Sequence, residues 1–142
     1  MQAAQGIDFS TIAERVELYT PATQQFQSAL SSAAGVTGIP TFAEYEAYLT
    51  VAALTQGLSS AGADPTSASF SSAPRNVNDF NAFGLFGDHK IDFSQYGSLA
   101  GGLGPDNCFW AVKLAGQKFS PITDAVPVCG TVIPGKKAQT GK

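Results

Sequence analysis

The stretch between residues 40 and 66, PTFAEYEAYLTVAALTQGLSSAGADPT, predicts one long helix with defined ends. Thr41 and Glu44 have the spacing of a capping box, in which each side chain satisfies a backbone N–H that the start of a helix leaves unpaired. The helix is expected to end at Gly62, because glycine readily takes the backbone conformation that ends a helix. A helix of this length must find a large apolar surface to pack on.

Two apolar stripes run along this predicted helix. They are formed by Tyr45, Tyr48, Leu49 and Ala52, and by Ala47, Val51, Leu54 and Leu58. Together the stripes cover well over half of the circumference, whereas a surface helix carries one apolar face. The pattern therefore predicts a helix that is buried on more than one side.

The segments before this helix predict a strand and a second helix. Residues 4–12 alternate apolar and polar side chains, which is typical of a short strand. Thr20 is a good N-cap and Pro21 follows at the first helical position, so a helix is expected to begin there. Phe26 and Leu30 lie on its apolar face, and Gly35 is expected to close it.

The segments after the long helix are shorter. Asp64 is expected to cap a short helix that has Phe70 as its apolar anchor and that ends at Pro74. Residues 76–107 are rich in Gly, Asn, Asp and Phe, and we expect loops there with extended pieces at 83–87 and 90–94.

The C-terminal third predicts a hairpin and a tail. The segments CFWAVKL and KFSPI are apolar and β-prone, and a glycine-containing turn joins them, which indicates a β-hairpin. Residues 123–142 show no periodicity and are expected to form an irregular tail tied back by Cys129. The order of elements predicts an α/β chain with a partial sheet.

Charge and hydropathy exclude two classes of partner. Only 13% of the residues are charged and the net charge is −3, so nothing suggests an electrostatic attraction to nucleic acid or anionic lipid. The aromatic residues lack the interleaved Arg and Lys of a platform that stacks nucleic-acid bases. No run approaches the roughly 18 apolar residues of a membrane-spanning helix. We therefore expect no nucleic-acid partner and no membrane span.

The sequence offers little for catalysis or metal binding. His89 is the only histidine and lies in the turn-like GDHK, where a surface loop residue is expected rather than a general base. No nucleophile elbow, phosphate-binding loop or HExxH motif is present. Cys108 and Cys129 are not a CxxC pair, and with one distant histidine they make a poor zinc set. We expect a protein without enzymatic activity, cofactor or metal.

The two cysteines leave two interpretations open. They are either buried free thiols or a disulfide, and sparse charge with abundant Ser, Thr, Asn and Gln favours the disulfide of an exported protein. The first ten residues, however, have neither the basic nor the apolar region of a signal peptide.

The order of four segments resembles the C-terminal part of type I substrate-binding proteins, the solute receptors of branched-chain amino acid ABC transporters. The segments are AAQGIDFST, TPATQQFQSAL, EYEAYLTVAALTQGLSSAGADPT and GPDNCFWAVKLAGQKF. The resemblance covers residues 3 to about 122, with the tyrosine-bearing helix as its most specific piece. It implies a partial three-layer α/β lobe with a C-terminal hairpin over residues 1–122, followed by an irregular tail over 123–142.

The resemblance also carries expectations about function. It implies a non-enzymatic, extracytoplasmic receptor that delivers an amino acid or a related polar solute to an ABC permease. The chain would be a fragment without the first lobe and without the signal peptide. In the family, that lobe and an acidic residue upstream of AQGIDFS hold most of the charged groups of the ligand. We therefore expect that the chain does not bind its solute alone.

The resemblance places the remaining ligand contacts near the start of the long helix. Phe42, Tyr45 and Tyr48 are carried over as an apolar wall of the ligand site, and the alternative is that all three are core aromatics. Asp8 is a weaker candidate at a strand end. The runner-up function is a small secreted structural or interaction protein that reuses the half-domain as a scaffold.

Overall fold

The computed structural model describes residues 4–95, 108–122 and 126–131. Its helices are α1 (Pro21–Ala34), α2 (Phe42–Ala61) and α3 (Ser67–Ser72), and short 3-10 turns are η2 (Val16–Leu18), η3 (Ala73–Asn76), η4 (Ala82–Gly84) and η5 (Phe93–Gln95). Its strands are β1 (Asp8–Thr11), β2 (Cys108–Ala115), β3 (Lys118–Pro121) and β4 (Val128–Cys129). The mixture of helix and sheet confirms the predicted α/β class.

The ends of α1 and α2 lie where the sequence predicts them. The Thr20 side chain accepts a hydrogen bond from the backbone of Thr23, and Gly35 closes α1 in the left-handed region with φ of 66°. At the start of α2, the Thr41 hydroxyl accepts from the Glu44 backbone N–H at 3.4 Å, and the Glu44 carboxylate accepts from the Thr41 N–H. These bonds satisfy donors that the first turn leaves unpaired.

The third helix begins two residues later than predicted. Its N-cap is Thr66 and not Asp64, because Ser69 completes a capping box with Thr66. The Ser69 backbone N–H donates to the Thr66 hydroxyl at 3.1 Å, and the Thr66 N–H donates to the Ser69 hydroxyl at 2.9 Å. Pro74 does not end this helix but lies inside η3, which continues directly from it.

The loop region between α3 and β2 is less extended than predicted. Residues 83–87 form η4 and turns, with Phe83 in the left-handed region at φ of 56°, so the expected extended piece is wrong. At 90–94, Ile91 exchanges backbone hydrogen bonds with Phe80 at 2.8 and 3.2 Å in an isolated bridge. The segment then turns into η5, and only the single bridge agrees with the prediction.

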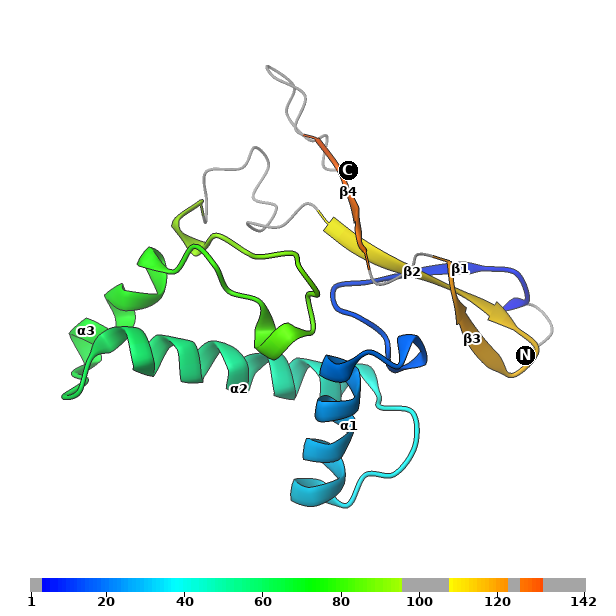
Figure 1. Ribbon diagram of the computed structural model, residues 1–142, viewed down its shortest axis with the longest axis horizontal. Coiled ribbons are helices and arrows are strands. Elements are labelled where there is room, and N and C mark those ends of the chain that lie inside the picture. The colour runs from blue at the N-terminus through cyan, green and yellow to red at the C-terminus, as the bar shows by residue number, and fades with distance from the viewer. Residues whose placement is uncertain (1–3, 96–107, 123–125, 132–142) are drawn as a thin grey trace, which may run out of the picture.

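Strand β2 is the centre of an antiparallel sheet. It lies between β1 and β3 at one end of the molecule, while α3 and the C-terminal part of α2 lie at the other (Figure 1). The turn between β2 and β3 contains Gly116 at φ of 65°, which confirms the predicted hairpin. The short β4 also pairs with β2, so residues 128–129 are a strand and not irregular tail. Residues 123–125 and 132–142 of the predicted tail lie outside the described residues.

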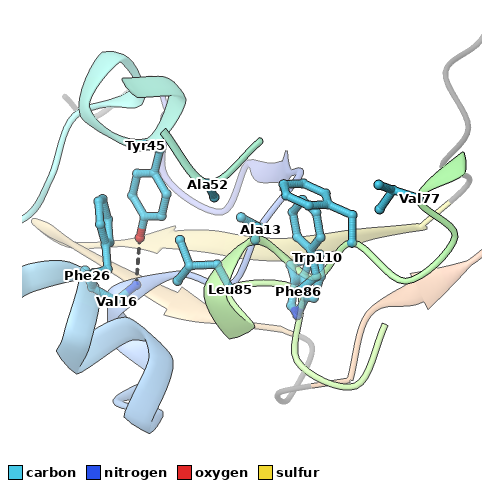
Figure 2. Close-up of a cluster of buried hydrophobic side chains, with 11 residues drawn as sticks. Ala13, Val16, Phe26, Tyr45, Ala52, Val77, Leu85, Phe86 and Trp110 are labelled. Atoms are coloured by element: carbon cyan, nitrogen blue, oxygen red, sulfur yellow. Dashed lines mark hydrogen bonds between the residues drawn. The ribbon is translucent and has the colours of Figure 1, made fainter. Parts of the chain in front are cut away.

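The core lies where the helices, the η4 loop and the sheet meet. Trp110 comes from β2, Phe26 and Tyr45 come from α1 and α2, and Leu85 comes from the loop after η4 (Figure 2). Val112 of β2 is buried as well. The contributing residues are far apart in the sequence. The core therefore joins the helical end to the sheet.

Helix α2 is buried on one side, which corrects the prediction of two buried sides. Tyr45, Ala52 and Gly57 are buried. The second apolar stripe is exposed in its Val51, Leu54 and Leu58 side chains. Helix α3 and the turns η3 and η4 contact α2, and Leu54 of the second stripe lines a pocket with Phe70 and Pro74, yet its side chain stays 47% exposed. Among the described residues, no helix combines the length and apolar character that a membrane crossing requires.

Candidate functional site

A pocket of about 130 Å³ lies between the end of β1 and the start of α2. Ile12 and Arg15 line it from the loop after β1, Phe42 and Tyr45 line it from α2, and Phe109 lines it from β2. Three segments that are far apart in the sequence therefore meet here. The lining is mainly apolar, with one cationic and one acidic side chain, Arg15 and Glu46.

Tyr45 forms the rigid part of the wall. Its side chain is 4% exposed, its ring lies 4.6 Å from the Phe26 ring, and its hydroxyl accepts a hydrogen bond from the Val16 backbone N–H at 2.9 Å (Figure 2). Burial raises the pKa of the Tyr45 phenol above its ordinary value of 10.0, because the charged form would lose its hydration. The Tyr45 side chain is therefore neutral across the physiological range.

Arg15 brings a cation next to this neutral ring. Its guanidinium carbon lies 4.9 Å from the centre of the Tyr45 ring, within the range of a cation–π contact. Its Nε lies 3.5 Å from a carboxylate oxygen of Glu17. The aromatic ring and the carboxylate hold the guanidinium beside the pocket.

The predicted ligand residues fall into two groups. Phe42 and Tyr45 lie together at the pocket, with Phe42 72% exposed and Tyr45 buried. Tyr48 does not line the pocket, because its ring lies 4.8 Å from Phe26 and 5.7 Å from Phe83. Burial raises the pKa of its phenol. The arrangement suits a core aromatic at Tyr48 and leaves a ligand contact open at the other two.

Two residues of this pocket carry no recognisable signal in the sequence. Arg15 lies in the irregular AERVEL, and Phe109 lies in a strand near the other end of the chain. Asp8, the weaker candidate, forms an ion pair with Lys113 at 3.5 Å across the sheet and does not line the pocket. Only the pairing of β1 with β2 reveals that Phe109 is close to the start of α2.

The cysteines form a disulfide, as favoured by the sequence. Cys108 and Cys129 are bonded, with 4.0 Å between their Cα atoms, and they lie opposite one another in β2 and β4. His89, which we expected to be distant, has its Nδ1 3.6 Å from the Cys108 sulfur. The separation in sequence was a poor guide here because the turn after η4 returns to the start of β2.

Comparison with protein-family models finds a match over residues 1–117 to the family described as periplasmic binding protein. Searches of curated proteins and of solved structures found no significant match. The matched range includes every element up to the turn of the hairpin, and with it all residues that line the pocket.

Proposed function

Because the chain belongs to the periplasmic binding protein family, we propose that it forms part of an extracytoplasmic receptor that delivers a small polar solute to an ABC permease. The family is one of binding proteins and not of enzymes. The disulfide between Cys108 and Cys129 supports an extracytoplasmic location, because such bonds persist in oxidising compartments. We assign the binding unit to residues 1–122 and the tail to residues 123–142.

The observation that carries this proposal is the pocket at the start of α2. It combines apolar side chains, among them Phe42 and Phe109, with one cation at Arg15 and one carboxylate at Glu46. Ligand sites are mostly apolar with a few polar groups that fix orientation. An amino acid with an apolar side chain has matching chemistry, since its carboxylate suits Arg15 and its ammonium suits Glu46.

The size of the pocket sets the expected affinity. Pockets for small ligands usually enclose roughly 300–1,000 Å³, whereas this one encloses about 130 Å³. The described residues therefore supply part of a wall and not a complete enclosure. In place of the expectation from the sequence that the chain does not bind its solute alone, we propose that it binds an amino acid weakly, with a Kd on the order of 1 mM or above.

An NMR titration of the chain with leucine tests this proposal. Millimolar leucine is expected to shift the resonances of Phe42, Tyr45 and Phe109, while glucose is expected to leave them unchanged. Phe42→Ala is expected to abolish these shifts. Phe83→Ala serves as the matched control, because Phe83 is an exposed phenylalanine that does not line the pocket.

Two results would contradict the proposal in different ways. Shifts confined to other regions would remove the pocket as the solute site. Micromolar binding by this chain alone would contradict the view that the described residues supply only part of the enclosure.

A structural or interaction protein is the second candidate. The observation in its favour is the exposed apolar stripe of Val51, Leu54 and Leu58 on α2, because contiguous exposed apolar surface marks interaction sites. Sedimentation of the chain with and without Leu54→Gln and Leu58→Gln distinguishes the two. A scaffold would associate through this stripe and would show no leucine-dependent shifts at the pocket.

A further inference from the structure

A second apolar groove lies between α2, α3, η3 and η5, away from the pocket at the start of α2. Its volume is about 440 Å³, and small-molecule sites usually enclose roughly 300–1,000 Å³. It is lined by Leu54 of α2, Phe70 of α3, Pro74 and Arg75 of η3, and Phe93 of η5. None of these residues lines the pocket at the start of α2. The groove is therefore a separate candidate site of suitable size.

The two aromatic walls of this groove are held in place by packing. The Phe70 ring lies against Gly57, because a Cβ at that position would be 3.0 Å from a ring carbon. The centre of the Phe93 ring lies 5.0 Å from that of the buried Phe80 ring. The Phe93 backbone N–H also donates to the carbonyl oxygen of the buried Val77 at 2.8 Å. The walls are therefore preformed, which lowers the entropic cost of ordering them around a ligand.

Apolar surface inside the groove stays open to solvent. Leu54 is exposed, and Phe70 and Phe93 are only half-buried. Removing such surface from water is favourable, and it is the main contribution that an apolar wall can make to binding. The part of a ligand that covers these three side chains is therefore expected to be apolar.

One charged side chain sets the polarity of the groove. Among the described residues that line it, Arg75 is the only ionisable one. Its side chain is exposed, and no described carboxylate forms an ion pair with it. A guanidinium group binds a carboxylate through two parallel hydrogen bonds. A ligand that carries one carboxylate therefore complements the charge of the groove.

The groove differs from the pocket at the start of α2 in its acidic side chains. That pocket has Glu46 beside Arg15, whereas the described lining of the groove has no carboxylate to pair with an ammonium group. We propose that the groove is a second ligand site, which binds a monocarboxylate with an apolar body and not a zwitterionic amino acid. The carboxylate pairs with Arg75, and the apolar body covers Leu54 and the two phenylalanine rings.

An NMR titration of the full chain with hydrocinnamate, a phenyl ring on a short alkanoic acid, tests the proposal. Millimolar hydrocinnamate is expected to shift the resonances of Phe70 and Phe93. Hydrocinnamyl alcohol has the same apolar body without the charge, and it is expected to bind about threefold to fivefold more weakly, which is the effect of one exposed ion pair. Phenylalanine, which adds an ammonium group to hydrocinnamate, is expected to cause smaller shifts at both residues.

A change of charge tests the role of Arg75. Arg75→Gln is expected to weaken the binding of hydrocinnamate about threefold to fivefold and to leave the binding of the alcohol unchanged. Lys90→Gln is the matched control, because Lys90 is an exposed cation that lines neither the groove nor the pocket at the start of α2. Its affinity for hydrocinnamate is expected to equal that of the parent chain.

A change of size tests the groove itself. Ala53 is an exposed residue of α2 that lines the groove, so the large side chain of Ala53→Trp is expected to fill it and to abolish the binding of both the acid and the alcohol. Ala47→Trp is the matched control, because Ala47 is exposed on the same helix outside the groove.

Three results would overturn the proposal: equal affinity of the parent chain for the acid and the alcohol, unchanged affinity in Arg75→Gln or Ala53→Trp, or shifts confined to residues outside the groove. The solute site is followed separately through Phe42, Tyr45 and Phe109. Failure of one site can therefore be distinguished from failure of the other.

Discussion

The hydroxyl oxygen of Tyr45 accepts a hydrogen bond of 2.9 Å from the backbone N–H of Val16, although 29 positions separate the two residues. The bond ties the first turn of α2 to the segment that precedes α1. The same ring contacts Phe26 and lies beneath the Arg15 guanidinium. Tyr45 is thus both a core residue and the back wall of the candidate pocket.

Tyr45→Phe is expected to destabilise the fold by about 1–3 kcal/mol, because it leaves the buried Val16 N–H without its acceptor and keeps the ring packing. Urea denaturation measures the change. Tyr19→Phe is the matched control, since Tyr19 is strongly exposed, and its effect is expected to stay within about 0.5 kcal/mol. Equal effects for the two variants would contradict a role for the bond to Val16.

Gly57→Val is expected to destabilise α2 at its contact with α3. A Cβ placed on Gly57 would lie 3.0 Å from the Phe70 ring and 3.4 Å from Pro74, so branched methyl groups would overlap them. Overpacking of this kind costs about 1–3 kcal/mol. Ala53→Val places the same β-branched residue on the exposed part of α2. It lowers helix propensity, whereas Gly57→Val raises it, so a larger loss of stability at Gly57 than at Ala53 reports the overlap. Thermal unfolding of both variants gives the comparison.

Glu14→Gln is expected to change how stability depends on pH. Burial raises the pKa of the Glu14 carboxyl above its ordinary value of 4.5; the Thr20 hydroxyl opposes this shift and the negative charge of Asp88 adds to it. The folded state therefore binds this proton more tightly than the unfolded state. The resulting stability is present below about pH 4.5 and is lost as pH rises through the folded pKa.

Because glutamine does not titrate, the variant is expected to gain stability relative to the parent chain between about pH 4 and pH 7. Urea denaturation at both pH values measures the difference in the free energy of unfolding. A difference that stays constant with pH would show that the buried carboxyl is not the cause.

Replacement of both cysteines by alanine is expected to lower the free energy of unfolding by about 3 kcal/mol, the chain-entropy estimate for a loop of this length. The two cysteines are 21 positions apart. Reduction of the parent chain should lower its stability by a similar amount. A much smaller loss would indicate that the unfolded chain keeps this loop closed by other contacts.

The sequence predicted best what depends on near neighbours. Thr41 with Glu44 and Thr20 with Pro21 define helix starts within four residues, so their caps were confirmed. The start of α3 was missed because Asp64 was taken as its cap, whereas Thr66, two residues later, forms the capping box with Ser69. Neighbouring residues predict the start of a helix well when one N-cap residue has its hydrogen-bonding partner at the expected spacing.

The sequence predicted least what depends on distant contacts. Phe42 and Tyr45 were chosen from family resemblance, whereas Arg15 and Phe109 joined the pocket only through the antiparallel pairing of β1 with β2. His89 was placed far from Cys108 because 19 positions separate them, yet the turn after η4 brings their side chains together. Spacing along the chain does not predict that a turn brings two such distant side chains together.

The pairing of β1 with β2 also fixes an order of assembly. The Gln5 side chain bonds Gly116 across 111 positions, and β2 is the strand with which β1 pairs in the described sheet. During synthesis, α1 and α2 can form from local contacts as soon as they leave the ribosome, whereas β1 must wait for the hairpin. The sheet is therefore completed last, and a nascent chain arrested before Cys108 exposes the apolar residues that Trp110 would otherwise cover.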